Sequence, residues 1–200
     1  RACAERHLSM IVLVTGGARS GKSRFAEQYA QKLGTEGIYV STAEAKDQEM
    51  RERICEHIKR REQMSMVWES IEEPLQLADR LEQIRLESRS EKAKQRIILV
   101  DCLTIWLSNG LLQSAQQPDA WKPAEQIKSL TEVLQRMRHH VILVTNEVGD
   151  GIVPEYELGR LFRDWAGRLN QQIAEVSEQV FLVTAGIPIE LKSRAYRWED

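Results

Sequence analysis

The stretch that decides the fold is "IVLVTGGARSGKS", residues 11–23, which reads as a strand, a glycine-rich loop and the start of a helix. The apolar, β-branched run at 11–15 is typical of a strand buried on both faces of a parallel sheet. The "GGARSGKS" after it, residues 16–23, fits the pattern G-x-x-x-x-G-K-[ST]. Because a strand precedes the motif and a helical pattern follows it, the match has the context that a phosphate-binding P-loop requires.

The residue types of this loop suit a nucleoside triphosphate. Gly16 and Gly21 let the backbone turn so that its N–H groups point at phosphate oxygens. Lys22, which we expect at the surface of the loop, adds a charge that reaches the β- and γ-phosphates, and Ser23 can ligate magnesium. A chance glycine turn is the alternative, but the flanking strand and helix favour the P-loop. The predicted nucleotide contacts are Gly16, Gly17, Ala18, Arg19, Ser20, Gly21, Lys22 and Ser23.

Short apolar runs alternate with helical patterns along the rest of the chain. Such alternation predicts an α/β fold of the P-loop NTPase class, with a mostly parallel sheet flanked by helices. We expect a disordered leader over 1–9 and one domain over 10–200. Residues 103–123 begin helical and then break into a polar loop, and the segment after Gly186 has no clear period. The predicted strands are 11–15, 37–42, 96–101, 140–146 and 179–185, and the predicted helices lie near 21–33, 47–62, 75–89, 124–138 and 155–177.

Composition excludes several classes of protein. The formal net charge is −2, so the chain as a whole has no attraction for nucleic acid or an anionic membrane. No apolar run approaches the roughly 20 residues that span a bilayer. The 3 cysteines are scattered and without CxxC spacing, which argues against a disulfide framework and a zinc site and fits a reducing cytoplasm.

A second acid marks the end of another predicted strand. "RIILVD" places Asp101 directly after four apolar residues, where a P-loop protein needs a magnesium-linked carboxylate. A strand cap is the simpler alternative, but beside a P-loop we favour the metal role, shared with Ser23. "TNEVGD" at 145–150 lacks the Lys-x-Asp of a guanine-nucleotide switch, and no basic stripe suggests a DNA-stimulated ATPase. A small-molecule kinase or nucleotidyl transferase remains.

The segment "EMRERICEHIKRR", residues 49–61, contains a histidine in an otherwise ordinary charged helix. Met50, Ile54 and Ile58 form one apolar stripe, and His57 lies at its edge. Arginines lie one turn before and one turn after it. From the residues alone, a solvated helix histidine without a role is the default reading.

Several blocks together resemble a known family, the bifunctional adenosylcobinamide kinase / adenosylcobinamide-phosphate guanylyltransferases of cobalamin biosynthesis. They are the P-loop block at 11–23, "YVSTAEAKDQEMRERICEH" at 39–57, "LVDCLTIWLSN" at 99–109 and "VTNEVGDGIVPEYELGRLFRDWAGRLNQQIA" at 144–174. The resemblance runs from Met10 to about Gly186. The last block is the most specific, whereas a P-loop alone is shared by many families.

The resemblance implies a RecA-like fold, a homotrimer and two activities. ATP or GTP phosphorylates adenosylcobinamide, and GMP from GTP then passes to adenosylcobinamide phosphate through a guanylyl-histidine, giving adenosylcobinamide-GDP. The position of that histidine is His57, which with Lys22 forms the expected catalytic pair. Mg²⁺ is the expected cofactor. Further nucleotide contacts implied are Thr42, Ala43, Glu44, Lys59, Arg60, Arg61, Glu62, Glu72 and Asp101.

Two features leave alternatives open. Glu62 stands where the family usually has proline, and Trp68 comes eleven residues after His57 rather than about eight, so a short insertion follows the helix. A protein that retains only the kinase, or a nucleotide-binding regulatory protein without transfer chemistry, therefore remains an alternative. The general base for phosphorylation is also open, between Asp101 and Glu147.

Overall fold

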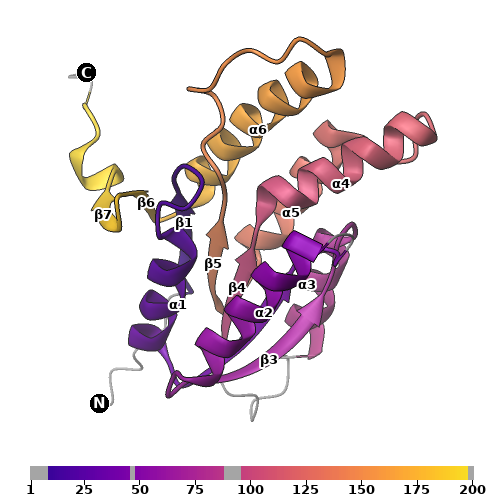
Figure 1. Ribbon diagram of the computed structural model, residues 1–200. Helices are drawn as coiled ribbons and strands as arrows, with labels where there is room; N and C mark the ends of the chain where they lie inside the picture. The colour runs from indigo at the N-terminus through magenta and orange to yellow at the C-terminus, as the bar shows by residue number, and fades with distance from the viewer. Residues whose placement is uncertain (1–8, 46–47, 88–95, 198–200) are drawn as a thin grey trace.

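The computed structural model describes residues 9–45, 48–87 and 96–197, and residues 1–8 of the predicted leader lie outside this range. Seven strands form one sheet in the order β3-β2-β4-β5-β1-β6-β7, and every pairing is parallel except that of β6 with β7 (Figure 1). The α/β prediction with a mostly parallel sheet is therefore confirmed. The strands are β1 (Ile11–Thr15), β2 (Glu36–Ser41), β3 (Val67–Glu72), β4 (Ile97–Asp101), β5 (His140–Val144), β6 (Gln179–Thr184) and β7 (Ile187–Glu190).

Helices cover both faces of the sheet. The first face carries the phosphate-loop helix α1 and the next helix α2, whereas α3, α5 and α6 pack on the other face, and α4 joins them there (Figure 1). In the described part of the chain, no helix combines the length and apolar composition needed to cross a bilayer. The helices are α1 (Lys22–Leu33), α2 (Gln48–Glu62), α3 (Leu77–Glu87), α4 (Leu103–Gln116), α5 (Pro123–Gln135) and α6 (Glu157–Val176), followed by the short 3₁₀ helix η1 (Lys192–Arg194).

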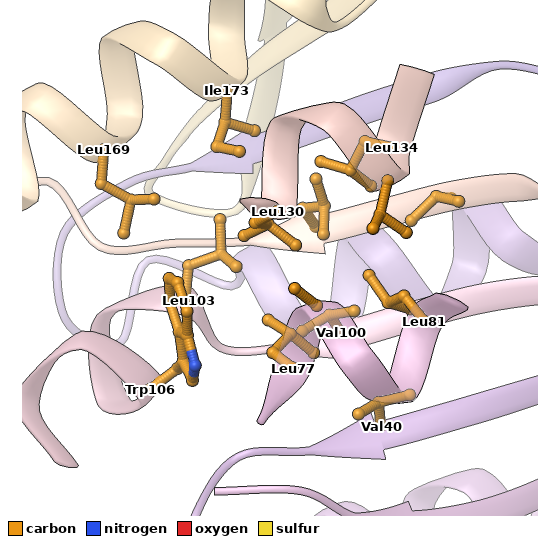
Figure 2. Packing of buried hydrophobic residues seen from close by; sticks show 14 of the residues in the cluster. Val40, Leu77, Leu81, Val100, Leu103, Trp106, Leu130, Leu134, Leu169 and Ile173 are labelled. Carbon is orange, nitrogen blue, oxygen red and sulfur yellow. The ribbon is translucent and has the colours of Figure 1, made fainter. Parts of the chain in front are cut away.

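The larger hydrophobic core lies between the sheet and the second layer of helices. Figure 2 shows Val40 and Val100 from the sheet packed against Leu77 and Leu81 of α3, with Leu130 of α5 beside them. These side chains are completely removed from solvent. The strands β1, β2, β4 and β5 contribute alternate residues to the two faces, which is why their buried residues are apolar at consecutive positions.

The sequence analysis did not predict two of the strands, β3 and β7. β3 and β7 lie at opposite edges of the sheet, and both expose most of their side chains. An edge strand packed on so little neighbouring structure carries no continuous apolar run, so neither segment shows the pattern of a buried strand. The segment after Gly186, which has no clear period, forms β7 and η1.

Candidate nucleotide and histidine site

One pocket opens at the carboxyl edge of the parallel strands, and seven of the predicted site residues line it. Its volume is about 260 Å³. Parallel α/β sheets bind ligands at this edge, because the loops that leave the strands converge there. The predicted residues that line the pocket are Lys22, Ser23, Ala43, His57, Arg61, Glu72 and Asp101.

The phosphate loop has the backbone that its glycines predict. Gly16 has φ +157°, and a Cβ built there would lie 2.4 Å from the carbonyl oxygen of Val183. Gly21 has φ +93° in the left-handed region and immediately precedes α1. Arg19 also has a positive φ, of 56°. Alternation into the left-handed region turns successive N–H groups toward one side, which is the arrangement that binds phosphate.

Lys22 is the first residue of α1, and the structure corrects its expected exposure. Its side chain is 8% exposed rather than at the surface, and its Nζ donates to the carbonyl oxygen of Gly17 at 3.0 Å. Ser23 follows it on the same turn and also lines the pocket. The ammonium group is thus held across the phosphate loop, at the positive end of the α1 dipole.

Asp101 ends β4 and faces the same pocket as Ser23. The hydroxyl of Tyr39 donates to Asp101 Oδ2 at 3.2 Å. Burial raises the pKa of Tyr39 well above its ordinary value, and the nearby Asp101 carboxylate adds to this, so the phenol stays a donor. Within the described residues, no group of three His, Cys, Asp or Glu side chains could enclose a metal. One carboxylate and one hydroxyl facing a phosphate site nevertheless fit Mg²⁺, which binds few protein oxygens and takes the rest from phosphates and water.

His57 lies on α2 between two carboxylates from other elements. Its Nδ1 is 3.7 Å from Asp101 Oδ2 and 3.8 Å from Glu27 Oε1. Burial lowers the pKa of His57 below its ordinary value of about 6.5, and Asp101 partly opposes that shift. The ring is therefore neutral at neutral pH, which is the state in which an imidazole can act as a nucleophile.

Arg60 connects His57 to the phosphate-loop helix. Its Nε and Nη2 donate to the two carboxylate oxygens of Glu27 at 2.5 and 2.9 Å. The same Nη2 lies 3.2 Å from His57 Nδ1. A guanidinium can only donate, so this last contact is a hydrogen bond in the tautomer whose Nδ1 carries no proton. Arg60 therefore contacts Glu27 and His57 and does not line the pocket, and its nucleotide contact stays a prediction.

Arg61 lines the pocket with a buried guanidinium. Its side chain is 6% exposed, and its guanidinium carbon lies 3.5 Å from the centroid of the Tyr39 ring. Its Nη1 lies 4.0 Å from Glu27 Oε1 and, among the described residues, has no hydrogen-bond partner. A buried donor without a partner is costly, and a phosphate oxygen would satisfy it.

Four further predicted nucleotide contacts do not line the pocket. Thr42 is completely buried, and its hydroxyl donates to the carbonyl oxygen of Cys102 at 2.7 Å. Glu44, Lys59 and Glu62 do not reach this pocket in the described part of the chain, and the last two are exposed. The region after the helix forms a turn over 63–66, which leads into β3.

Sequence reasoning missed Glu27 and Tyr39. Glu27 falls within the buried stripe of α1, between Ala26 and Ala30, and is only 1% exposed. A charged residue inside an apolar stripe was the available signal, because such a residue has to be paired. Tyr39 was read only as part of a strand, and nothing in its spacing indicated the contact with Asp101.

The most family-specific block, 144–174, stabilises the loop beside the pocket. Asn170 of α6 accepts a hydrogen bond from Thr145 at 2.7 Å and donates to the carbonyl oxygen of Asn146 at 3.1 Å. Asn146 lines the pocket and donates to Thr104 at 2.8 Å. Glu147 is exposed, and its carboxylate accepts from the Gly149 N–H at 3.1 Å. That contact matches a loop carboxylate satisfied by nearby backbone.

Comparison with known proteins identifies relatives over nearly the whole chain. Residues 12–191 match the family model described as cobinamide kinase / cobinamide phosphate guanyltransferase. The bifunctional adenosylcobalamin biosynthesis protein CobP of Pseudomonas aeruginosa is 46% identical over 90% of this chain and 96% of its own length. The bifunctional adenosylcobalamin biosynthesis protein CobU of Escherichia coli is 38% identical over 92% of this chain and 100% of its own.

Solved structures support the fold alone. A prototypical ATPase from the type III secretion system of pathogenic bacteria superposes with a TM-score of 0.52 at 10% identity. The match covers 92% of this chain and 57% of that ATPase. The likeness supports the mostly parallel α/β fold.

Proposed function

The chain belongs to the cobinamide kinase / cobinamide phosphate guanyltransferase family, and from this premise we propose how its pocket serves both reactions. The chain is a bifunctional transferase of adenosylcobalamin biosynthesis. We propose that one nucleoside triphosphate site supports phosphorylation of adenosylcobinamide and then GMP transfer to the phosphorylated product. The observation that carries this is the placement of Lys22 and His57 on the wall of the same pocket.

In the first reaction the pocket positions the triphosphate and offsets its charge. Lys22, the loop N–H groups and the start of α1 attract the phosphates, and the Nη1 of Arg61, which has no hydrogen-bond partner among the described residues, adds a donor. Ser23 and Asp101 would hold Mg²⁺, which shields the charge that moves onto the leaving phosphate. The cobinamide hydroxyl then attacks the γ-phosphorus of ATP or GTP as the bond from that phosphorus to the β,γ-bridging oxygen breaks. ADP or GDP leaves with the electron pair, and the hydroxyl proton passes to a base or to solvent.

In the second reaction His57 is the nucleophile. One ring nitrogen forms a bond to the α-phosphorus of GTP as the bond from that phosphorus to the bridging oxygen breaks, and pyrophosphate leaves with the electron pair. The proton of the imidazole passes to solvent. An oxygen of adenosylcobinamide phosphate then attacks the same phosphorus, and the bond to the histidine breaks. The pocket therefore accommodates two nucleophiles in turn, first His57 and then adenosylcobinamide phosphate.

The decisive test is an assay of the purified protein with adenosylcobinamide. Either ATP or GTP should phosphorylate adenosylcobinamide. GTP should then also convert the phosphorylated product to adenosylcobinamide-GDP, with release of pyrophosphate. Thin-layer chromatography separates the products. Phosphorylation without GMP transfer would support the kinase-only alternative. Nucleotide binding with neither product would support the regulatory alternative.

Asp101→Asn tests the proposed metal site. Asparagine keeps the shape but loses the charge, so magnesium affinity should fall by at least about 10-fold. Phosphorylation should be slow at low magnesium and recover as the ion is titrated. Asp79→Asn, on the exposed first turn of α3, is the control and should titrate as wild type does. An unchanged magnesium dependence in Asp101→Asn would assign the metal to another acid.

The assembly and compartment stay proposals. The homotrimer that the resemblance implies predicts a sedimentation-velocity mass of three chains of 23.1 kDa. A cytoplasmic location agrees with the two described cysteines, Cys55 and Cys102, which are both free thiols. Adenosylcobinamide and its phosphate are the proposed substrates.

A further inference from the structure

Glu27 is a buried carboxylate next to the site. It lies on α1, and its side chain is 1% exposed. Burying an ion pair adds little to stability, because the loss of hydration offsets the attraction between the charges. Ala26 and Ala30 are buried on the same helix, so a small apolar side chain at position 27 would also suit this buried stripe. The position of this charge is therefore better explained by the residues it holds.

The residue that Glu27 holds most firmly is Arg60. Two parallel hydrogen bonds, at 2.5 and 2.9 Å, join the guanidinium to both carboxylate oxygens. Such a two-bond pair fixes the plane of the guanidinium as well as its distance. Arg60 lies one helical turn after His57, and its Nη2 lies 3.2 Å from the imidazole Nδ1. At this distance the guanidinium touches the ring whichever nitrogen carries the proton, so fixing the guanidinium also restricts the imidazole.

The helix that carries Glu27 also carries the phosphate-binding residues. Lys22 and Ser23 begin α1, and Glu27 follows Lys22 by five residues, or about 7.5 Å along a rigid helix. His57 belongs to α2, a different helix. The bond between Glu27 and Arg60 thus connects the element that holds the triphosphate to the element that carries the nucleophile. A displacement of about 1 Å between reacting groups can cost about 10²-fold in rate.

We propose that Glu27, acting through Arg60, is a positioning residue that sets His57 against the α-phosphorus of GTP in guanylyl transfer. This inference rests on the proposed role of His57. While the nitrogen–phosphorus bond forms and pyrophosphate leaves, the ring gains positive charge until its proton passes to solvent. The Glu27 carboxylate at 3.8 Å and the Asp101 carboxylate at 3.7 Å from Nδ1 lie where they offset that charge, which the Arg60 guanidinium opposes.

The first test is Glu27→Gln, assayed by single-turnover labelling of the full-length protein with GTP radiolabelled at the α-phosphate. Glutamine keeps the shape but cannot hold Arg60 by two charged bonds. The rate of His57 labelling at saturating GTP should fall by about 10- to 100-fold, with little change in the GTP concentration that gives half the maximal rate. Phosphorylation of adenosylcobinamide should fall far less, because His57 takes no part in it.

Arg60→Lys tests the same contact between α1 and α2 from the other partner. It also keeps the proposal testable if Glu27→Gln does not fold. Lysine leaves a cation beside Glu27 but provides no planar fork, so labelling should slow to a similar extent. If Glu27 acts through Arg60, the double variant should be no slower than the slower single variant. A raised half-saturating GTP concentration in Arg60→Lys would instead indicate a nucleotide contact and overturn the positioning role.

Glu82→Gln is the matched control. Glu82 accepts two hydrogen bonds from Arg85, at 2.7 and 2.6 Å, in a similar fork on α3 away from the pocket. It should label at the wild-type rate. Wild-type labelling in Glu27→Gln, or effects of the two variants that multiply, would overturn the proposal. Absence of label in the wild-type protein would instead contradict the proposed role of His57, so the two failures are distinguishable.

Discussion

Replacing His57 by alanine should abolish guanylyl transfer while adenosylcobinamide phosphorylation continues near the wild-type rate. Alanine removes the nucleophile but leaves Lys22, Ser23 and Asp101, which line the same pocket. Removal of a nucleophile costs orders of magnitude, so GMP transfer should fall by at least about 10³-fold.

The chemical nature of the intermediate supplies a second measurement on the same variant. Wild-type protein incubated with GTP labelled at the α-phosphate should retain label that is acid-labile and base-stable, as a phosphoramidate is. His57→Ala should retain none. The control is His140→Ala, at the amino end of β5 and therefore at the opposite edge of the sheet, which should label normally. Label that persists on His57→Ala would show that another residue carries GMP.

Lys22→Ala should abolish both reactions. Lys22 reaches across the phosphate loop at the start of α1, and both half-reactions require the triphosphate to be held there. Loss of one preorganised charged donor typically costs about 10²- to 10³-fold in rate, and here the loss should apply to phosphorylation and to GMP transfer alike. Both products should be assayed in the same preparation.

Lys32→Ala is the matched control for that experiment. Lys32 lies in the last turn of the same helix and is exposed, so its loss should leave both rates unchanged. Thermal unfolding of both variants checks that the fold is intact, because Lys22 is buried and its removal leaves a small void. Near-normal GMP transfer in folded Lys22→Ala would mean that the two activities use separate nucleotide sites.

The phosphate loop and the central strands could be predicted because their signals are local. The apolar run of β1 indicates a strand that is covered on both faces of the sheet. Gly16 and Gly21 of the loop indicate positions with a positive φ. Asp101 was predicted on the same basis, since it follows an apolar run directly. The residues alone did not distinguish His57 from a solvated histidine, and only the family resemblance raised it.

The sequence by itself determined the α/β class, the nucleotide-binding loop, the acid at the end of β4 and, through resemblance, the histidine on α2. Only the tertiary structure decided that residues 27, 57, 60 and 101 meet, and that Arg60 contacts Glu27 and His57. The physical reason is that helical and strand periodicities record which face of an element is buried, not which other element covers it. The neighbours of His57 follow from the packing of α1 and α2 on one face of the sheet, and no spacing in the chain encodes that packing.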